Sequence, residues 1–386
     1  MPTMNKQILA ASTLICVVLA ACTPAVAGEN PAETADSAAL TPALEMEGGK
    51  TAFAETAAPA PEPAGINPLT GLPVYNGALL ERRPVMLKVS NFPRVGRPHA
   101  GLSYADIVFD YYIGYGTNRF LTVYYGQDSP RVGPIRSGRR VDAELVKMYG
   151  GVLGYGSADN DTDAVLRNAL GEYAISHLEA PCPVFCGEDT HSATGVFADS
   201  AALSRYVSEQ GLDNRAPNLE GMAFSDEQPA GGEDGNQVNI LFNFFNRAEW
   251  RYDSASGRYL RWIEYMEDED SQEFEMIPLA DSVTGRQLAF SNIIIISAYY
   301  TELAPSAHEI DILGNRRGLP AVFFRDGRKY TGTWAVPDAG APMRFFDENG
   351  EDFPLKPGST WVAIAGFSSS FRENEPGIWE LFFYLP

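Results

Sequence analysis

Basic side chains, cysteine and histidine are all scarce in this chain of 386 residues. Its 29 Lys and Arg stand against 50 Asp and Glu, which gives a formal net charge of −21, and it has only 4 cysteines and 4 histidines. So large a negative charge argues against nucleic acid, and against anionic lipid, as partners of a folded body. Against this background, any local cluster of arginines is informative.

Long apolar runs are absent beyond the N-terminus, so no transmembrane helix is expected there. Lys6 and the apolar stretch 8–20 are typical of a secretory signal. The stretch ends in Leu-Ala-Ala-Cys22, which resembles the lipobox of bacterial lipoproteins. This resemblance implies a signal peptide at 1–21 and acylation of the Cys22 thiol, with palmitate among the acyl chains. The alternative is an ordinary secretory signal cut after Ala25 or Ala27.

The expected location is therefore extracytoplasmic, with a lipid anchor in the cell membrane. In a cell with two membranes the outer membrane is favoured, because Thr23 is not the aspartate of an inner-membrane retention signal. The acylated Cys22 and the Ala- and Pro-rich residues up to 65 predict a disordered tether at 22–65.

The rest of the chain predicts an α+β protein with two domains. A mixed α/β domain at 66–211 is followed by a polar, glycine-rich linker or loop at 212–236. A smaller, mostly antiparallel β domain then occupies 237–386.

Periodicity and turn residues predict the individual elements. In the first domain they are strands at 84–89, 105–112, 119–125 and 152–155, and helices at 137–149, 161–170 and 200–210. In the second they are strands at 238–245, 292–297, 360–365 and 378–384, and a hairpin over 251–262. The continuous apolar run 292–297 predicts a strand buried on both faces. Asp326-Gly327 and Asn349-Gly350 predict tight turns.

Only two cysteines remain for the body, Cys182 and Cys186, in the run Pro-Cys-Pro-Val-Phe-Cys-Gly. In an oxidising compartment they are a candidate for a disulfide closing a small loop, and free thiols are the next alternative. No histidine spacing accompanies them, so a zinc site is not favoured. The run Asp-Asn-Asp-Thr-Asp at 159–163 resembles the start of a calcium loop, but Ala164 and Leu170 replace its glycine and glutamate. We expect a carboxylate-rich helix N-terminus there, and neither metal nor cofactor.

The segment 131–140 reads Arg-Val-Gly-Pro-Ile-Arg-Ser-Gly-Arg-Arg and contains no acid. Guanidinium groups around a helix N-terminus form a ready anion site. The candidate ligand-binding residues are Arg97, Arg119, Arg136, Ser137 and Arg139. The candidates for an adjoining polar centre are Asp106, Asp110 and His191. The alternative is structural: the arginines pair with acids of the same body and hold a loop in place.

Several segments together resemble the YerB-like family of bacterial lipoproteins, which is defined by N- and C-terminal domains of unknown function. The matching segments are 67–71 (Asn-Pro-Leu-Thr-Gly), 83–91, 97–108 (Arg-Pro-His-Ala-Gly-Leu-Ser-Tyr-Ala-Asp-Ile-Val), 119–120, 132–139, 191, 252–253, 281, 284–285, 292, 332–334, 344–350 and 357–361. The resemblance implies a mixed α/β domain followed by a smaller one, and no known reaction. Where the family tends to have two glutamates before Thr-Arg, this chain has only Asp110, and His191-Ser192 replaces His-Asn.

The function predicted from these observations is a binding or scaffold lipoprotein of the cell envelope. Its partner would be an anionic small molecule, a wall component or an envelope protein. The alternative is an envelope hydrolase or transferase, in which His191 is the general base, Arg136 and Arg139 bind an anion, and Asp106 or Asp110 orients the base. A purely structural role beside a membrane complex would need a protein partner and no small ligand. No Gly-x-Ser-x-Gly elbow, His-Glu-x-x-His helix or Walker loop is present, so enzymatic activity stays open and is not favoured.

Overall fold

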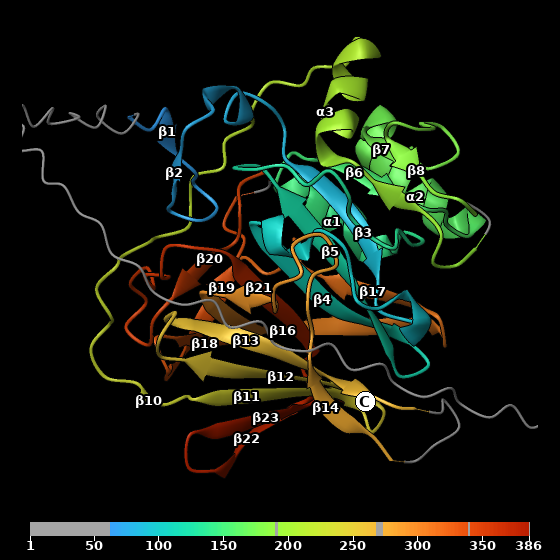
Figure 1. The fold of residues 1–386 in the computed structure, drawn as a ribbon. Coiled ribbons are helices and arrows are strands. Elements are labelled where there is room, and N and C mark those ends of the chain that lie inside the picture. The colour runs from blue at the N-terminus through green and yellow to red at the C-terminus, as the bar shows by residue number, and fades with distance from the viewer. Residues whose placement is uncertain (1–61, 190–191, 268–272, 339, 386) are drawn as a thin grey trace, which may run out of the picture. The chain divides into compact units, whose positions relative to one another are not determined.

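A mixed sheet of twelve strands is the central element of the fold (Figure 1). The computed structural model describes residues 62–189, 192–267, 273–338 and 340–385. Strands account for 42% and helices for 13% of the structure. The predicted α+β class is therefore supported only loosely, because the helical content is low.

Ten strands of the central sheet follow one path, and two more attach beside it. In order they are β10 (Glu233–Asp234), β19 (Arg328–Ala335), β18 (Leu319–Arg325), β16 (Asn292–Ala304), β21 (Thr360–Gly366), β4 (Ile107–Gly114), β5 (Thr117–Tyr124), β3 (Val85–Ser90), β6 (Val152–Tyr155) and β7 (Ala174–Ser176), with β17 (Ala307–Asp311) on β16 and β20 (Arg344–Phe346) on β19.

The two halves of the chain meet in this sheet. β21, from the C-terminal half, pairs in parallel with β4, from the N-terminal half, with Thr360 opposite Ile107. Residues Ala60–Pro386 accordingly form one compact unit. The two predicted regions, 66–211 and 237–386, therefore both contribute strands to the same sheet.

A second sheet of seven strands covers part of one face of the central sheet (Figure 1). Its strands are β14 (Glu275–Pro278), β13 (Arg258–Tyr265), β12 (Asn246–Asp253), β11 (Gln237–Asn243), β23 (Ile378–Phe382) and β22 (Ser370–Glu375), with β15 (Ala289–Phe290) on β13. Trp250 from this sheet packs with Trp361 of β21, their ring centroids 4.9 Å apart, in the apolar core between the sheets.

Three helices cover the sheet at the β3–β7 end: α1 (Arg140–Met148), α2 (Asn160–Leu170) and α3 (Ser200–Glu209). α1 and α2 bury Leu145 and Leu166 against one face, in a core with Met86 and Leu153 of the sheet. α3 buries Leu203 against the opposite face of β3. Smaller elements complete the chain: β1 (Gly65–Ile66), β2 (Pro73–Val74), β8 (Phe185–Cys186), β9 (Phe197–Ala198), η1 (Gly77–Leu79), η2 (Arg94–Gly96), η3 (Leu102–Tyr104) and η4 (Gly171–Tyr173).

Local sequence explains several elements directly. Successive isoleucines of β16 alternate between the two cores, with Ile293 on one side and Ile294 on the other, which confirms the prediction of a strand buried on both faces. Asp326 and Gly327 both have positive φ, 53° and 72°, as the two-residue turn between β18 and β19 requires. The side chain of Asp159 accepts the Thr162 amide at 2.9 Å, so it is the N-cap of α2.

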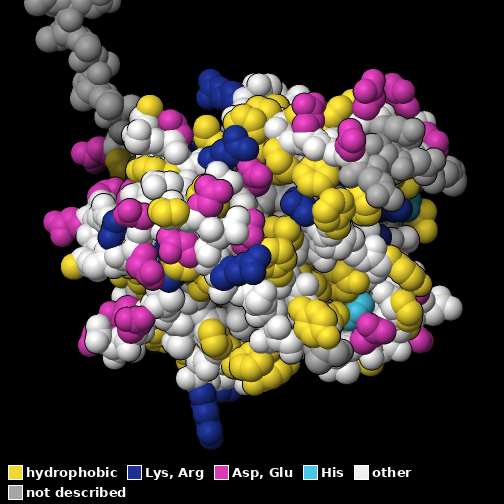
Figure 2. Space-filling model, turned by 90° about the horizontal axis from the view of Figure 1, so that it is seen from below, with side chains coloured by type: hydrophobic (Ala, Val, Ile, Leu, Met, Phe, Trp, Pro, Cys, Tyr) yellow, Lys and Arg dark blue, Asp and Glu magenta, His cyan; other side chains and the backbone are white. Residues whose placement is uncertain are grey.

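The long connection 212–236 has little regular structure apart from β10, which pairs with β19. Within the described residues, no helix combines the length and apolar character needed to cross a membrane. The face seen in Figure 2 carries acidic, basic and hydrophobic side chains intermixed, so the excess of acid is not gathered into one patch there.

Candidate functional site

A pocket lies where three parallel strands of the central sheet end. β6 pairs in parallel with β3 on one side and β7 on the other. Gly156 and Ser157 leave the carboxyl end of β6, and His177 and Leu178 leave that of β7; all four line the pocket. The carboxyl ends of parallel strands are where open α/β sheets bind their ligands, because the connecting loops diverge there.

The arginine-rich segment 131–140 lies over this edge of the sheet, and backbone hydrogen bonds fix its position. The Arg136 amide donates to the Lys88 carbonyl at 2.8 Å, and the Gly156 amide donates to the Arg136 carbonyl at 2.9 Å. The Gly138 amide donates to the Ser157 carbonyl at 2.8 Å. Gly133 has φ 150°, and a Cβ there would lie 2.9 Å from the Ile135 nitrogen, so a side chain would disrupt this path.

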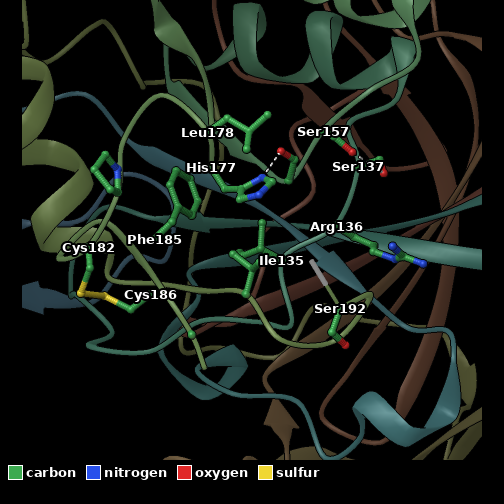
Figure 3. A pocket seen from close by; sticks show the side chains of 14 residues that line it. Ile135, Arg136, Ser137, Ser157, His177, Leu178, Cys182, Phe185, Cys186 and Ser192 are labelled. Atoms are coloured by element: carbon green, nitrogen blue, oxygen red, sulfur yellow. Dashed lines mark hydrogen bonds between the residues drawn. A yellow bond between two sulfur atoms is a disulfide. The ribbon is translucent and has the colours of Figure 1, made fainter. Parts of the chain in front are cut away.

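The pocket has a volume of about 800 Å³ and two kinds of wall (Figure 3). Arg136, Ser137, Ser157 and His177 form a polar side. The apolar side consists of Ile135, Leu178, Phe185 and Val196.

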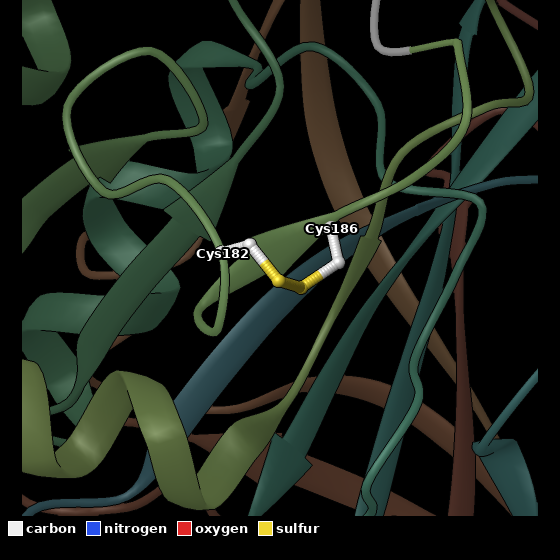
Figure 4. The surroundings of a disulfide bond; sticks show 2 residues. All are labelled: Cys182 and Cys186. Carbon is white, nitrogen blue, oxygen red and sulfur yellow. A yellow bond between two sulfur atoms is a disulfide. The ribbon is translucent and has the colours of Figure 1, made fainter.

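A disulfide joins the predicted pair Cys182 and Cys186 beside β8 (Figure 4). Both half-cystines line the pocket, so the covalent loop forms part of its apolar side.

Three of the predicted ligand-binding arginines gather near the polar side of the pocket. Burial and the charges of Arg139 and Arg136 lower the pKa of Arg119 to about 9. The Arg119 Nη1 donates to the Ser137 carbonyl at 2.7 Å. Nε of Arg136 and Nε of Arg139 are buried and have no hydrogen-bond partner, and none of the three guanidinium groups forms an ion pair with a described carboxylate. A local excess of positive charge is therefore held next to the pocket.

Of the remaining two arginines of the segment 131–140, Arg140 fits the structural alternative of pairing with an acid, and Arg131 stacks on an aromatic ring instead. Arg140 pairs with Glu309 at 3.1 Å, and the Arg131 guanidinium lies 3.5 Å from the centroid of the Phe197 ring. Among the residues described, Arg136 and Arg139 are the two arginines of this segment whose guanidinium groups have neither an ion-paired carboxylate nor an aromatic ring as a partner.

A buried network supports the arginines from below. Lys88 Nζ and the Tyr111 hydroxyl both bind Oδ1 of Asp142, and Lys88 Nζ lies 3.3 Å from that oxygen. Burial lowers the pKa of Lys88 to about 7, although Asp142 opposes this shift. Burial also raises the pKa of Tyr111 well above its ordinary value.

A contact of Asp142 explains why α1 starts later than predicted. Its Oδ2 accepts the Arg139 amide at 2.7 Å, so α1 begins at Arg140 and Ser137 is not the N-cap. The helix predicted at 137–149 is thus three residues shorter at its start. Because an internal carboxylate already accepts this donor, attraction for a ligand anion rests on the guanidinium groups more than on the helix N-terminus.

His177 is a pocket residue that the sequence reasoning missed. Its Nδ1 is hydrogen-bonded to the Gly156 carbonyl, which can only accept, so Nδ1 carries the proton. In the neutral ring Nε2 is then an acceptor. The signal available in the sequence was the strand-like 174–176 directly before the histidine, which places it at a strand end.

The other predicted site residues lie elsewhere. Arg97 donates from Nη1 to Glu264 Oε1 at 3.0 Å, toward the second sheet, and so does not join Arg136. Asp110 accepts from Asn118 on that same face of the sheet, and burial raises its pKa to about 6. Asp106 is tied to the chain by the Tyr125 and Gly126 amides at 2.7 and 2.9 Å.

Several predictions lie outside the described residues: the signal peptide at 1–21, acylation at Cys22, the tether as far as residue 61, and the role of His191. Two of the three carboxylates of the run 159–163 are engaged within the protein, since Asp159 caps α2 and Asp163 accepts from Tyr155 at 2.6 Å and from Arg167 at 2.7 Å. In the part of the chain that the structure describes, no group of three or more His, Cys, Asp or Glu side chains is arranged to hold a metal ion.

Comparison with known proteins gives consistent matches. Residues 69–213 match the N-terminal domain and residues 238–362 the C-terminal domain of a family described as "Protein of unknown function (DUF3048)". A Bacillus subtilis (strain 168) protein named "Putative lipoprotein YerB" is 26% identical over 302 residues, which are 77% of this chain and 85% of that protein. The crystal structure of the YerB protein from Bacillus subtilis covers 78% of this chain and 96% of its own, with a TM-score of 0.64 and 23% identity, and this likeness shows the fold. The chain belongs to the YerB-like family, whose members combine the N- and C-terminal DUF3048 domains.

Proposed function

We propose that this protein is a lipoprotein of the cell envelope, anchored through Cys22, whose body binds an anionic ligand in the pocket beside Arg136. The anchor is supported by the lipobox-like residues before Cys22 and by the name of the Bacillus subtilis relative. The disulfide between Cys182 and Cys186 suits a location outside the reducing cytoplasm.

One observation carries the proposal for binding. In a chain with a net charge of −21, Arg119, Arg136 and Arg139 come together without a paired carboxylate among the described residues. Charged groups that are partly buried are normally paired, because desolvation is costly without compensation. An anionic ligand would supply that compensation. The pocket between Arg136 and His177 has the room to admit it.

The test is a thermal-shift titration of the purified full chain with inorganic phosphate and sulfate. A ligand at 100 times its dissociation constant should stabilise the folded state by about 2.7 kcal/mol. Arg136→Ala should abolish this shift. The matched control is Arg215→Ala, which removes an exposed arginine paired with Asp213 and should leave the shift intact. An equal shift in wild type and Arg136→Ala would contradict the proposal, as would no shift with either anion.

The alternative function, an envelope hydrolase or transferase, is favoured by one described feature. The hydrogen bond to Gly156 orients the His177 ring, and its Nε2 is the acceptor that a general base requires. His177 would then take the part that the sequence suggested for His191. Release of p-nitrophenol from p-nitrophenyl phosphate, lost in His177→Ala, would support this alternative; no turnover by the wild type would count against it.

A further inference from the structure

We infer that the ligand is an organic phosphate monoester, with its phosphate against the arginines and its organic group against the apolar wall of the same pocket. This inference rests on the proposed anion-binding function. It adds the chemical class of the ligand, which the arginine cluster alone does not define.

The local charge favours a doubly charged anion. Of the three guanidinium groups, those of Arg119 and Arg139 interact electrostatically with Asp142, and that of Arg139 also interacts with Asp159. Burial lowers the pKa of Arg136. Lys88 adds further positive charge from below, in proportion to its protonation. A phosphate monoester carries about −1.5 to −2 charge at neutral pH and offers three acceptor oxygens. A monocarboxylate would leave part of the positive charge uncompensated.

The donors around the polar side suit a tetrahedral anion. Arg136, Ser137 and Ser157 line the pocket, and the hydroxyl oxygens of the two serines lie 3.4 Å apart. Arginine and hydroxyl groups are frequent partners of phosphate because each supplies a directional donor. Figure 3 shows these side chains on one side of His177.

The apolar side provides a place for an organic group. Phosphate alone would leave most of a pocket of about 800 Å³ unused. Leu178 lines this pocket with 78% of its surface exposed, whereas Ile135, Phe185 and Val196 behind it are each 3% exposed. An apolar ring or chain bound there would remove the Leu178 side chain from water, which is favourable by the hydrophobic effect.

His177 connects the two sides of the pocket. In Figure 3 its ring has Phe185 and the disulfide on one side and the serines and Arg136 on the other. With Nδ1 held by Gly156, Nε2 is left to meet the polar part of the ligand. A long phosphodiester polymer is disfavoured, because a body with so negative a net charge repels polyanions.

Isothermal titration of the full chain with three probes tests this inference. Inorganic phosphate carries the anion alone, phenyl phosphate adds a ring, and benzoate combines the ring with a carboxylate. Phenyl phosphate should bind about 10-fold tighter than inorganic phosphate, because burying an apolar group of this size contributes about 1.4 kcal/mol. It should also bind about 10-fold tighter than benzoate, because its phosphate carries more negative charge and a third acceptor oxygen. Leu178→Ser should weaken phenyl phosphate about 10-fold and leave inorganic phosphate unchanged. Since Leu178 is exposed, this substitution should not unfold the protein.

Each outcome separates the two claims. If phenyl phosphate binds no tighter than phosphate, or is insensitive to Leu178→Ser, the organic ester is wrong and the anion site stands. If benzoate matches phenyl phosphate, the preference for phosphate is wrong. If none of the three probes binds, the proposed function itself fails.

Discussion

Two groups of arginines lie on opposite faces of the central sheet, and they differ in the partners that their guanidinium groups have. On the face toward the second sheet, Arg94 and Arg97 share the buried carboxylate of Glu264, at 3.3 and 3.0 Å. Arg261 lies there too, its guanidinium carbon 4.1 Å from the centroid of the Trp361 ring. On the face toward α1, Arg136 and Arg139 lack any such partner in the described chain.

The comparison separates arginines that hold the fold from arginines for which we propose a ligand. Arg97 and Arg261 are enclosed, and acidic or aromatic groups of the protein compensate their charge. Arg136 borders an open pocket, and the two acids that interact with its neighbour Arg139 also serve other groups: Asp142 binds Lys88, and Asp159 caps α2. The first group should therefore govern stability and the second affinity.

The largest expected effect is on the free energy of unfolding, and it concerns the arginines on the face toward the second sheet. Glu264→Ala removes the carboxylate shared by Arg94 and Arg97 and leaves two partly buried charges unpaired. Breaking a buried pair in this way typically costs about 3–5 kcal/mol. Urea denaturation measures the loss, and phosphate binding by the surviving folded fraction should be unchanged. A loss no larger than that of an ordinary surface substitution would remove the distinction between the two groups.

The next effect concerns pH. Burial raises the pKa of Asp110 to about 6 in the folded protein, above its ordinary value of 3.8, although Arg261 opposes this shift. Between pH 4 and 6 the folded state then binds more protons than the unfolded state, so Asp110 makes the free energy of unfolding fall as pH rises, by about 3 kcal/mol at most. Asp110→Asn should remove this fall from the pH profile of stability. If the free energy of unfolding depends on pH in the same way in the wild type and in Asp110→Asn, the pKa of Asp110 is not raised in the folded protein.

Replacing Arg136 and Arg97 by alanine, one at a time, gives two variants with opposite expected effects. Arg136→Ala should weaken phosphate binding at least about 10-fold, since a charge-assisted hydrogen bond contributes about 1.5–3 kcal/mol, and should change the free energy of unfolding by less than about 0.5 kcal/mol. Arg97→Ala should do the opposite, because it leaves Glu264 with one partner fewer inside the protein. Calorimetric titration and urea denaturation of both variants provide the comparison. Equal losses of affinity would mean that both arginines act only through the fold.

The smallest expected effect concerns the net charge next to the pocket. Asp159 lowers the net positive charge near Arg139, and asparagine caps helices as well as aspartate does. Asp159→Asn should therefore leave stability nearly unchanged and tighten phosphate binding about 2- to 5-fold at low salt, an increment that 0.5 M NaCl should erase. Weaker binding in this variant would place the phosphate away from Arg139.

Local patterns in the sequence predicted much of the fold. The strand expected at 152–155 is β6, Val152–Tyr155, and the helix expected at 161–170 starts one residue earlier, at Asn160, where Asp159 caps it. Membership of the YerB-like family, inferred from segments such as 97–108 and 132–139, is confirmed. These features depend on neighbouring residues, or on motifs that local sequence preserves.

Long-range pairing could not be predicted in the same way. Nothing near Thr360 indicates that it will lie opposite Ile107, so the sheet shared by both halves of the chain was not foreseen. Arg97 was a candidate for the same site as Arg136, but spacing along the chain could not show whether they lie together, and the carboxylate partner of Arg97, Glu264, is 167 residues away. Arg119 lies near Arg139 and Arg136 because β5 pairs with β3, the strand that carries Lys88, with Arg119 opposite Ser90.

The most direct test of the account is to locate an anion in a crystal of the protein. Tungstate, a tetrahedral dianion visible by anomalous scattering, would be soaked into crystals of the wild type and of Arg136→Ala. We predict a tungsten peak in the pocket, with tungstate oxygens that accept hydrogen bonds from the Arg136 guanidinium and the Ser137 and Ser157 hydroxyls, and no such peak in the variant. A peak that persists in Arg136→Ala, or wild-type crystals whose peaks all lie outside this pocket, would contradict the central claim.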